Sequence, residues 1–134
     1  MIEIREYTHY QEKEILALYA SVGWTAYTDH PETLRIGFEY SLLTLAAYHG
    51  DELAGIIRTV GDGQTIVLIQ DLLVVPKYQR KGIGSQLLKA ALTQFPHVRQ
   101  IQLITDNTPK TLAFYRSLGF VPMDELGCCG LMLT

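Results

Sequence analysis

Cysteine, basic charge and long apolar runs are scarce in this sequence, and each scarcity excludes a class of protein. The only two cysteines, Cys128 and Cys129, are adjacent, so they provide neither a disulfide framework nor zinc-ligand spacing. We expect them to be small buried residues in a protein that holds no metal. The formal net charge of −3 argues against the basic face of a nucleic-acid-binding protein. No apolar run reaches the roughly 18 residues that a membrane span needs.

The N-terminus and the chain length indicate a cytoplasmic protein of one domain. Residues 1–6 alternate charged and aliphatic side chains, which is typical of a strand and not of a secretory signal. A chain of 134 residues has room for one domain, which we place at residues 1–134. With 48% hydrophobic and 19% charged residues, the composition favours a folded core over disorder.

Hydrophobic periodicity predicts two helices, then three strands, then alternating elements. Thr8 and Gln11 have capping-box spacing before the first helix, and Asp29 with Pro31 marks the start of the second. Thr108 and Pro109 open the last helix, and Gly119 ends it. After the first two helices, the expected elements are strands at 43–49, 53–60 and 65–75, a helix at 84–95, a strand at 101–105, the last helix, and closing strands at 120–123 and 126–134.

The strand at 65–75 is nearly all apolar, which predicts a central strand covered on both faces. Short glycine turns join it to the two strands before it, so these three strands form an antiparallel meander. The helix that follows must return the chain to a parallel neighbour. The sequence therefore predicts one mixed sheet with helices on both sides.

The segment from residue 79 to 85 joins that strand to the N-terminus of a helix, where unpaired backbone N–H groups favour an anion. Gly82 and Gly84 would let a phosphate approach the backbone, and Arg80 and Lys81 add positive charge. The alternative is a polar loop whose glycines only ease a tight turn. No P-loop string occurs, and a dinucleotide-binding fingerprint is disfavoured because Leu87 replaces its third glycine.

Gln79, Gly82 and Gly84 match the pattern Q/R-x-x-G-x-G/A, and the segment resembles the acyl-CoA-binding signature of the GNAT family of N-acetyltransferases. The likeness continues in residues 71–76, in Asn107 and in residues 113–120, and the order of elements agrees over the whole chain. The resemblance implies an α/β (α+β) fold, with a mixed, mostly antiparallel central sheet of about six to seven strands and about four helices on both faces.

The resemblance also implies a site for acetyl-CoA. The strand backbone would pair with the pantetheine arm, and an N–H exposed where this strand separates from the next would polarise the thioester carbonyl. The backbone amides of residues 80–85 would hold the pyrophosphate. The implied cofactor-binding residues are Leu72, Leu73 and Val74 on the strand, and Gln79, Arg80, Lys81, Gly82, Ile83, Gly84 and Ser85 in the loop.

Two residues of the last helix region have roles implied by the same resemblance. Tyr115 would protonate the departing thiolate, which suits a phenol because it is still protonated at neutral pH. The alternative is an aromatic residue on the core face of a helix. Asn107 would bind the pantetheine, but one extra residue in the spacing leaves helix capping by Asn107 or Thr108 as the alternative.

Asp71 is the first candidate for the base that deprotonates the acceptor amine, because it interrupts an apolar strand beside the acyl-binding residues. A paired structural carboxylate is the alternative. Glu39 and His30 are weaker candidates. Trp24 and Tyr27, with Phe38 and Tyr40 near them in the sequence, would form an aromatic wall for a cationic or apolar amine.

The resemblance therefore implies an N-acetyltransferase that moves an acetyl group from acetyl-CoA directly to a primary amine, expected to be that of a small molecule. Two alternatives remain: a protein or peptide N-acetyltransferase, and a non-catalytic acyl-CoA-binding module. Homodimerisation through the apolar segment 127–133 is a further hypothesis, because a closing strand there would leave an exposed edge.

Overall fold

The structure, a computed structural model, describes every residue from Met1 to Thr134. The chain divides into two compact units, Met1–Leu103 and Ile104–Thr134, which are described separately. The first unit contains β1 (Ile2–Glu6), α1 (Glu12–Ser21), α2 (Thr25–Thr28), α3 (Pro31–Glu39), β2 (Leu43–His49), β3 (Glu52–Gly61), β4 (Ile66–Val74), the 3-10 helix η1 (Pro76–Tyr78), α4 (Ile83–Leu92) and β5 (Gln100–Leu103). The second contains α5 (Pro109–Ser117) and the 3-10 helix η2 (Met123–Leu126).

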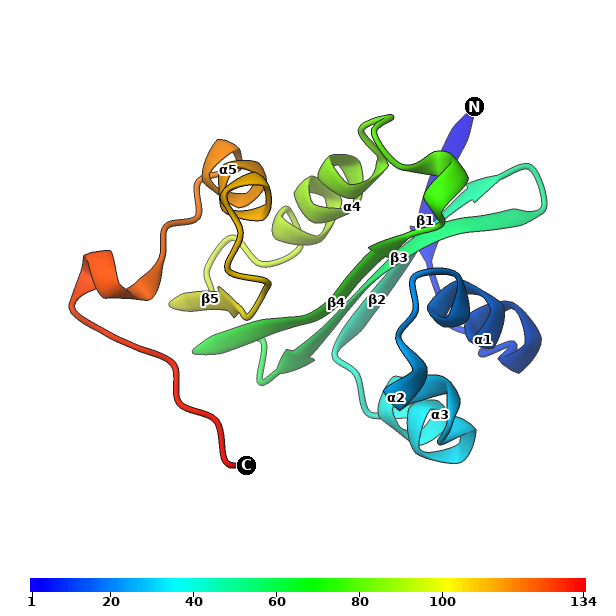
Figure 1. The fold of residues 1–134 in the computed structure, drawn as a ribbon, viewed down its shortest axis with the longest axis horizontal. Coiled ribbons are helices and arrows are strands. Elements are labelled where there is room, and N and C mark those ends of the chain that lie inside the picture. The colour runs from blue at the N-terminus through cyan, green and yellow to red at the C-terminus, as the bar shows by residue number, and fades with distance from the viewer. The chain divides into compact units, whose positions relative to one another are not determined.

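The five strands form one mixed sheet in the order β1-β2-β3-β4-β5. Neighbours from β1 to β4 are antiparallel, and β4 pairs with β5 in parallel, so the predicted mixed sheet is confirmed. Within this unit α1, α2 and α3 lie on one face of the sheet and α4 lies on the other (Figure 1). The middle strand is β3, whose residues from Leu53 to Thr59 are all buried. The strand predicted at 65–75 is β4, which lies inside the sheet between β3 and β5, with helices on both faces of the sheet.

Amphipathic helices bury one stripe each against the two faces of the sheet. Ile15, Leu18 and Tyr19 of α1 pack against a cluster that includes Ile56 and Leu73. On the other face, the buried residues of α4 are Ile83, Leu87, Leu88 and Ala91. Full burial of one such aliphatic side chain contributes about 1.5–3 kcal/mol. The two clusters fix the sheet between its helices and thereby position the ends of β4.

A β-bulge in β4 explains why its apolar run has no simple alternation. Arg58 pairs with Asp71 but the next residue, Thr59, pairs with Ile69, so Gln70 is an extra residue without a partner in β3. Cross-strand partners share a face of the sheet. The bulge therefore leaves Asp71 on the face of Arg58, whereas Ile69 lies on the opposite face with Thr59.

The predicted closing strands at 120–123 and 126–134 are wrong, and the sheet has five strands instead of six or seven. Pro122 has no N–H to donate to a ladder, and the chain turns into η2 immediately after it. Gly127 then adopts a left-handed conformation with φ of 77°, which ends any extended run.

Two predicted helix starts are also corrected. The first helix begins at Glu12, because the N–H of Gln11 donates to the Tyr7 hydroxyl and Thr8 contacts His9 instead of capping. The next long helix begins at Pro31 as expected for a first-turn proline, but His30 occupies the N-cap and Asp29 ends α2. In the second unit the prediction for Thr108 is confirmed: its hydroxyl accepts a hydrogen bond from the Thr111 N–H and caps α5.

Candidate functional site

The loop between η1 and α4 presents a run of backbone N–H groups that no protein atom accepts. Arg80 and Gly82 adopt left-handed conformations, with φ of 63° and 81°. The N–H of Gln79 donates to Pro76, and the next backbone donor with an acceptor is Gln86, which donates to Gly82 at 3.0 Å. The N–H groups between them, which have no acceptor, belong to Arg80, Lys81, Gly82, Ile83, Gly84 and Ser85.

The same loop is open and positively charged. Arg80 and Lys81 are exposed, and a Cβ added to Gly82 would meet no atom within 4 Å. The first turn of a helix carries a partial positive charge from its unsatisfied N–H groups. Gln79 does not point into this space, because its side chain donates to the Val74 carbonyl at 2.9 Å. The loop that the sequence predicts to bind an anion therefore has the unpaired backbone N–H donors that such binding requires.

The outer edge of β4 is unpaired next to this loop. β5 pairs with β4 only from Ile66 to Ile69, and no strand covers the outer edge beyond that point. The N–H of Val75 donates to Ala54 of β3. Because successive residues of a strand point their backbone groups to opposite sides, those of Leu72 and Val74 point away from β3. An extended chain could therefore add to this edge at Leu72 and Val74, with Leu73 turned toward β3.

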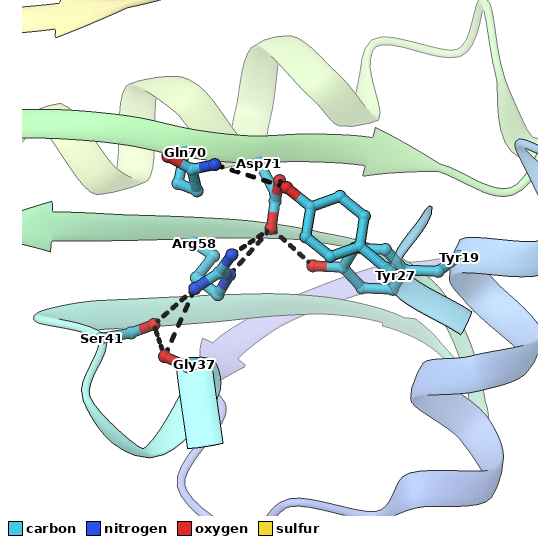
Figure 2. A network of polar contacts seen from close by, with 7 residues as sticks. All are labelled: Tyr19, Tyr27, Gly37, Ser41, Arg58, Gln70 and Asp71. Atoms are coloured by element: carbon cyan, nitrogen blue, oxygen red, sulfur yellow. Dashed lines mark hydrogen bonds and ion pairs between the residues drawn. The ribbon is translucent and has the colours of Figure 1, made fainter. Parts of the chain in front are cut away.

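A buried polar network centred on Asp71, the residue after the bulge, joins β3, β4, α1 and α2 (Figure 2). Oδ2 of Asp71 accepts hydrogen bonds from the Tyr19 hydroxyl at 2.8 Å and from Nε of Arg58 at 2.8 Å. Oδ1 accepts one from the Tyr27 hydroxyl at 3.0 Å. Arg58 also forms an ion pair with Asp71 at 2.8 Å and donates to Ser41 at 3.1 Å. Asp71 and Arg58 are 2% and 5% exposed.

Desolvation by burial raises the pKa of both tyrosines in this network above its ordinary value. Tyr19 and Tyr27 therefore keep their protons at neutral pH and act as donors to Asp71. The hydrogen bonds and the ion pair of Asp71 are those of a paired structural carboxylate, which was the alternative to a catalytic base. Asp71 is buried with Tyr19 and Arg58, and Tyr27 is its only partly exposed donor. Its role as the base stays a prediction.

The predicted aromatic wall is only partly assembled. Trp24 and Tyr27 are half-buried neighbours with ring centroids 6.1 Å apart, and Tyr27 also packs on Tyr19 at 5.1 Å. Phe38 packs on Tyr19 and lies under the Arg58 guanidinium at 5.3 Å, so it belongs to the core. Tyr40 is 79% exposed and does not join the cluster.

Glu39 and His30 take no part in the network. Glu39 is exposed and pairs with Arg35 at 3.5 Å, while the exposed His30 precedes α3 without a side-chain capping bond. A separate hollow of about 580 Å³ lies beside the end of β1 and is lined by Tyr7, Tyr10 and Phe38 among others. It contains neither the loop nor Asp71 nor Tyr27, so we do not include it in the candidate site.

Sequence reasoning missed Tyr19 and Arg58. Tyr19 lies in the expected first helix and Arg58 in the expected strand at 53–60, and neither position by itself indicates a polar site. The signal for Arg58 was its hairpin partner, but counting back from the turn pairs Gly61 with Val67 and would place Arg58 opposite Gln70. The bulge shifts that register by one residue and brings Arg58 to Asp71.

In the second unit, Tyr115 lies on α5 with its ring packed against Phe114 at 5.0 Å and Phe120 at 5.9 Å. Desolvation by burial raises the pKa of Tyr115 above its ordinary value, and a hydrogen bond with Thr105 opposes that shift. The phenol is therefore protonated at neutral pH, as the predicted acid requires. Asn107 is exposed and precedes the capping Thr108, so its predicted contact with pantetheine stays a prediction.

Three further features bear on the sequence predictions. Cys128 and Cys129 are free and exposed, so their expected burial is wrong; they follow the left-handed Gly127 in a segment without regular structure. No cluster of three or more His, Cys, Asp or Glu side chains is arranged to hold a metal ion. None of the helices combines the length and the apolar character that crossing a membrane would take.

Comparison with known proteins gives consistent matches. Residues 9–129 match the model of the acetyltransferase (GNAT) domain. A GNAT-family acetyltransferase from Streptococcus pneumoniae is 42% identical, with a TM-score of 0.92 over 100% of this chain and 98% of that one. A Staphylococcus aureus protein of unknown function, described as an acetyltransferase, is 25% identical with a TM-score of 0.84, over 100% of this chain and 99% of that one.

Matches to curated sequences are shorter. A Gibberella zeae protein named as an acetyltransferase is 35% identical over 71 residues, which are 51% of this chain and 39% of that protein. The chain thus spans well under two thirds of the length of this curated relative.

Proposed function

The chain belongs to the GNAT acetyltransferase family, and from this premise we propose that it transfers an acetyl group from acetyl-CoA directly to the primary amine of a small molecule. The observation that carries the proposal is the run of six backbone N–H groups without acceptors from Arg80 to Ser85. These donors, at the N-terminus of α4, suit the pyrophosphate of coenzyme A. Arg80 and Lys81 supply the matching charge.

The edge of β4 supports a second part of the proposal, the position of the donor's arm. The amide-containing pantetheine would add to the free backbone groups of Leu72 and to the N–H of Val74, whose carbonyl accepts from Gln79, as an extended chain adds to a sheet. A backbone N–H near the end of the β4–β5 ladder would then stabilise the oxyanion that forms as the amine attacks the thioester carbonyl. Such a donor typically contributes about 3–4 kcal/mol to transition-state stability.

Tyr115 completes the proposed chemistry as the general acid. The amine nitrogen forms the new amide bond, the carbon–sulfur bond breaks, and the Tyr115 phenol gives its proton to the departing thiolate. The amine loses its own proton to a base or to solvent. Direct transfer is preferred to a covalent acyl-enzyme because the loop, β4 and α2 carry no cysteine.

The acceptor proposal rests on Trp24 and Tyr27, which form a half-buried aromatic surface beside the bulge. Rings of this kind suit a compact cationic or apolar amine. Turnover can be measured as thiol release from acetyl-CoA with polyamines, amino acids, aminoglycosides and peptides in turn. Activity with small amines alone supports the proposal, whereas activity with peptides alone favours the protein-acetylating alternative. Binding of coenzyme A without turnover of any amine would favour a non-catalytic module.

Calorimetry with coenzyme A tests the loop, and the chain offers a matched control for it. Gly82 and Gly23 have φ of 81° and 78°, and a Cβ at either would meet no protein atom within 4 Å. Alanine at either position should cost the same backbone strain of about 1–2 kcal/mol. Only at Gly82 would the new methyl group occupy the space of the pyrophosphate. We expect Gly82→Ala to weaken coenzyme A binding about 10-fold, a loss of about 1.4 kcal/mol, and Gly23→Ala to leave it unchanged. A wild-type protein that gives no binding heat would contradict the proposal.

A further inference from the structure

Gln70 occupies a distinctive position on β4. It is the extra residue of the bulge, between the positions that pair with Arg58 and Thr59. It also follows Ile69, the last residue of β4 that pairs with β5. Its side chain is exposed, in contrast to those of its two neighbours in the strand. A bulge commonly redirects a side chain toward a functional site.

The polarity of the buried network fixes which end of the Gln70 carboxamide faces outward. An ionised carboxylate can only accept hydrogen bonds, so the Tyr27 hydroxyl must donate its single proton to Asp71. The oxygen of Tyr27 can then only accept from Gln70, whose side chain lies 3.3 Å away. That contact requires the NH₂ group, so the carboxamide oxygen points away from Tyr27, as in Figure 2. This oxygen accepts no hydrogen bond from the protein.

The rest of the network prevents the polarity from reversing. Arg58 pairs with Asp71 at 2.8 Å, and a carboxylate paired with a guanidinium only accepts hydrogen bonds. The guanidinium is itself held by the Ser41 hydroxyl and by the Gly37 carbonyl at 3.3 Å. Gly37 leaves little spare room there, because a Cβ at this position would lie 3.4 Å from the guanidinium. The charges inside the protein therefore set the orientation of an exposed amide.

We infer that the outward-facing oxygen of Gln70 receives an N–H of the acceptor amine and thereby selects and orients it. The inference rests on the proposed function, because it assumes that the acyl group lies where β4 and β5 separate. Gln70 binds the amine without accepting its proton, since a carboxamide is not a base at neutral pH. Asp71 and the Tyr27 hydroxyl are positioning groups that act on the amine through Gln70, whereas the Tyr27 ring belongs to the aromatic surface.

Steady-state kinetics with the best amine of the panel test the binding step. Removal of the acceptor in Gln70→Ala should raise KM for the amine about 10-fold, since hydrogen bonds to charged groups exceed neutral ones in strength. KM for acetyl-CoA should stay unchanged. Tyr27→Phe should raise the amine KM less, because the carboxamide can then flip. Gln64→Ala, on the exposed turn before β4, is the matched control and should behave as wild type. Equal amine KM values in Gln70→Ala and wild type would overturn the inference, as would an equal rise in both KM values.

Nuclear magnetic resonance tests the orientation independently of turnover. The Gln70 NH₂ proton that donates to Tyr27 should have a chemical shift displaced from that of a solvent-exposed carboxamide, and this displacement should disappear in Tyr27→Phe. Titration with the amine should move the Gln70 signals in the wild type. If the chemical shifts of the Gln70 carboxamide are the same in Tyr27→Phe as in the wild type, the inference is overturned even when the enzyme is active. A wild type that binds coenzyme A but acetylates no amine would instead overturn the proposed function, and the Tyr27→Phe spectrum would still decide the orientation.

Discussion

At the scale of single residues, the buried pair of Arg58 and Asp71 is the most consequential feature of the molecule. Burial of two charges costs several kcal/mol each, and their mutual attraction offsets this only when further hydrogen bonds satisfy them. Here Tyr19, Tyr27 and Ser41 supply those bonds. The pair therefore contributes orientation to the site more than it contributes stability.

Removal of one partner should be far more harmful than removal of both. Asp71→Ala leaves an uncompensated buried guanidinium and should lower the free energy of unfolding by about 3–5 kcal/mol. Arg58→Met should do the same, whereas Arg58→Met combined with Asp71→Leu should recover much of the loss because no charge stays buried. Urea denaturation measures all three. The control is Asp51→Ala at an exposed turn, which should be neutral. A double variant as unstable as the sum of the singles would refute this account.

The protonation of Tyr115 predicts the pH dependence of turnover. An ordinary tyrosine has a pKa of about 10, and burial raises the pKa of this one further. The acid form is therefore fully present from neutral pH up to that region, and kcat should fall only at higher pH, as the phenol ionises. Tyr115→Phe should lower kcat about 100-fold and leave KM for acetyl-CoA unchanged. Tyr40→Phe, which alters an exposed ring, is the control. Full turnover in Tyr115→Phe would remove the assignment of the acid.

At the scale of elements, the sequence was most informative where local chemistry decides the structure. The glycines and the strand-to-helix order of residues 79–85 sufficed to predict a loop of free N–H groups. The bulge at Gln70 could not be predicted, because it depends on the pairing of β3 with β4 and not on any local signal. A one-residue shift in register moves each side chain of a strand to the opposite face of the sheet. The hydrogen-bond partners of Asp71 therefore could not be predicted either. The sequence thus predicted the loop of free N–H groups but not the network around Asp71.

The turn between β3 and β4 is held by one carboxylate. Asp62 accepts hydrogen bonds from the Thr65 hydroxyl and from the N–H groups of Gln64, Thr65 and Ile66, which hold its pKa well below the usual range. The pKa of Asp62 is thus lower in the folded state than in the unfolded state, where it is about 3.9. The ionised carboxylate therefore stabilises the folded state fully at pH values above about 3.9. This stabilisation is lost as the pH falls toward and through the pKa of the folded state.

Asp62→Ala should therefore lower the urea midpoint at pH 7, where the carboxylate is ionised in both states. The difference from wild type should shrink as pH falls below about 4, because the wild type then loses this contribution. Asp51→Ala, at the exposed turn between β2 and β3, is the control and should leave the urea midpoint at pH 7 unchanged. A difference that stays constant down to pH 2 would show that the turn is stabilised by something other than this charge.

At the scale of the whole molecule, the hydrophobic pattern correctly predicted the mixed sheet but wrongly predicted closing strands after residue 119. The expected closing strands need partners and N–H donors, and Pro122 and Gly127 interrupt both. The segment after η2 instead leaves its apolar side chains in solvent: Leu131 is 93% exposed and Leu133 is 99% exposed. Contiguous exposed apolar residues of this kind commonly mark a contact with another chain.

We propose that this segment contacts a second copy of the chain. The homodimer is thus still proposed, although the closing strands that were expected to form its interface are absent. Sedimentation velocity should give a mass near twice the 15.1 kDa of one chain at high concentration. Leu131→Asp with Leu133→Asp places two charges in the proposed contact and should return the protein to a monomer with coenzyme A binding intact. Ile36→Asp, which adds a charge at an exposed apolar position of α3, controls for the charge itself and should leave the dimer in place. A wild type that sediments as one chain at every concentration would exclude the dimer, whereas a dimer that survives both aspartates would mean that the contact lies elsewhere on the molecule.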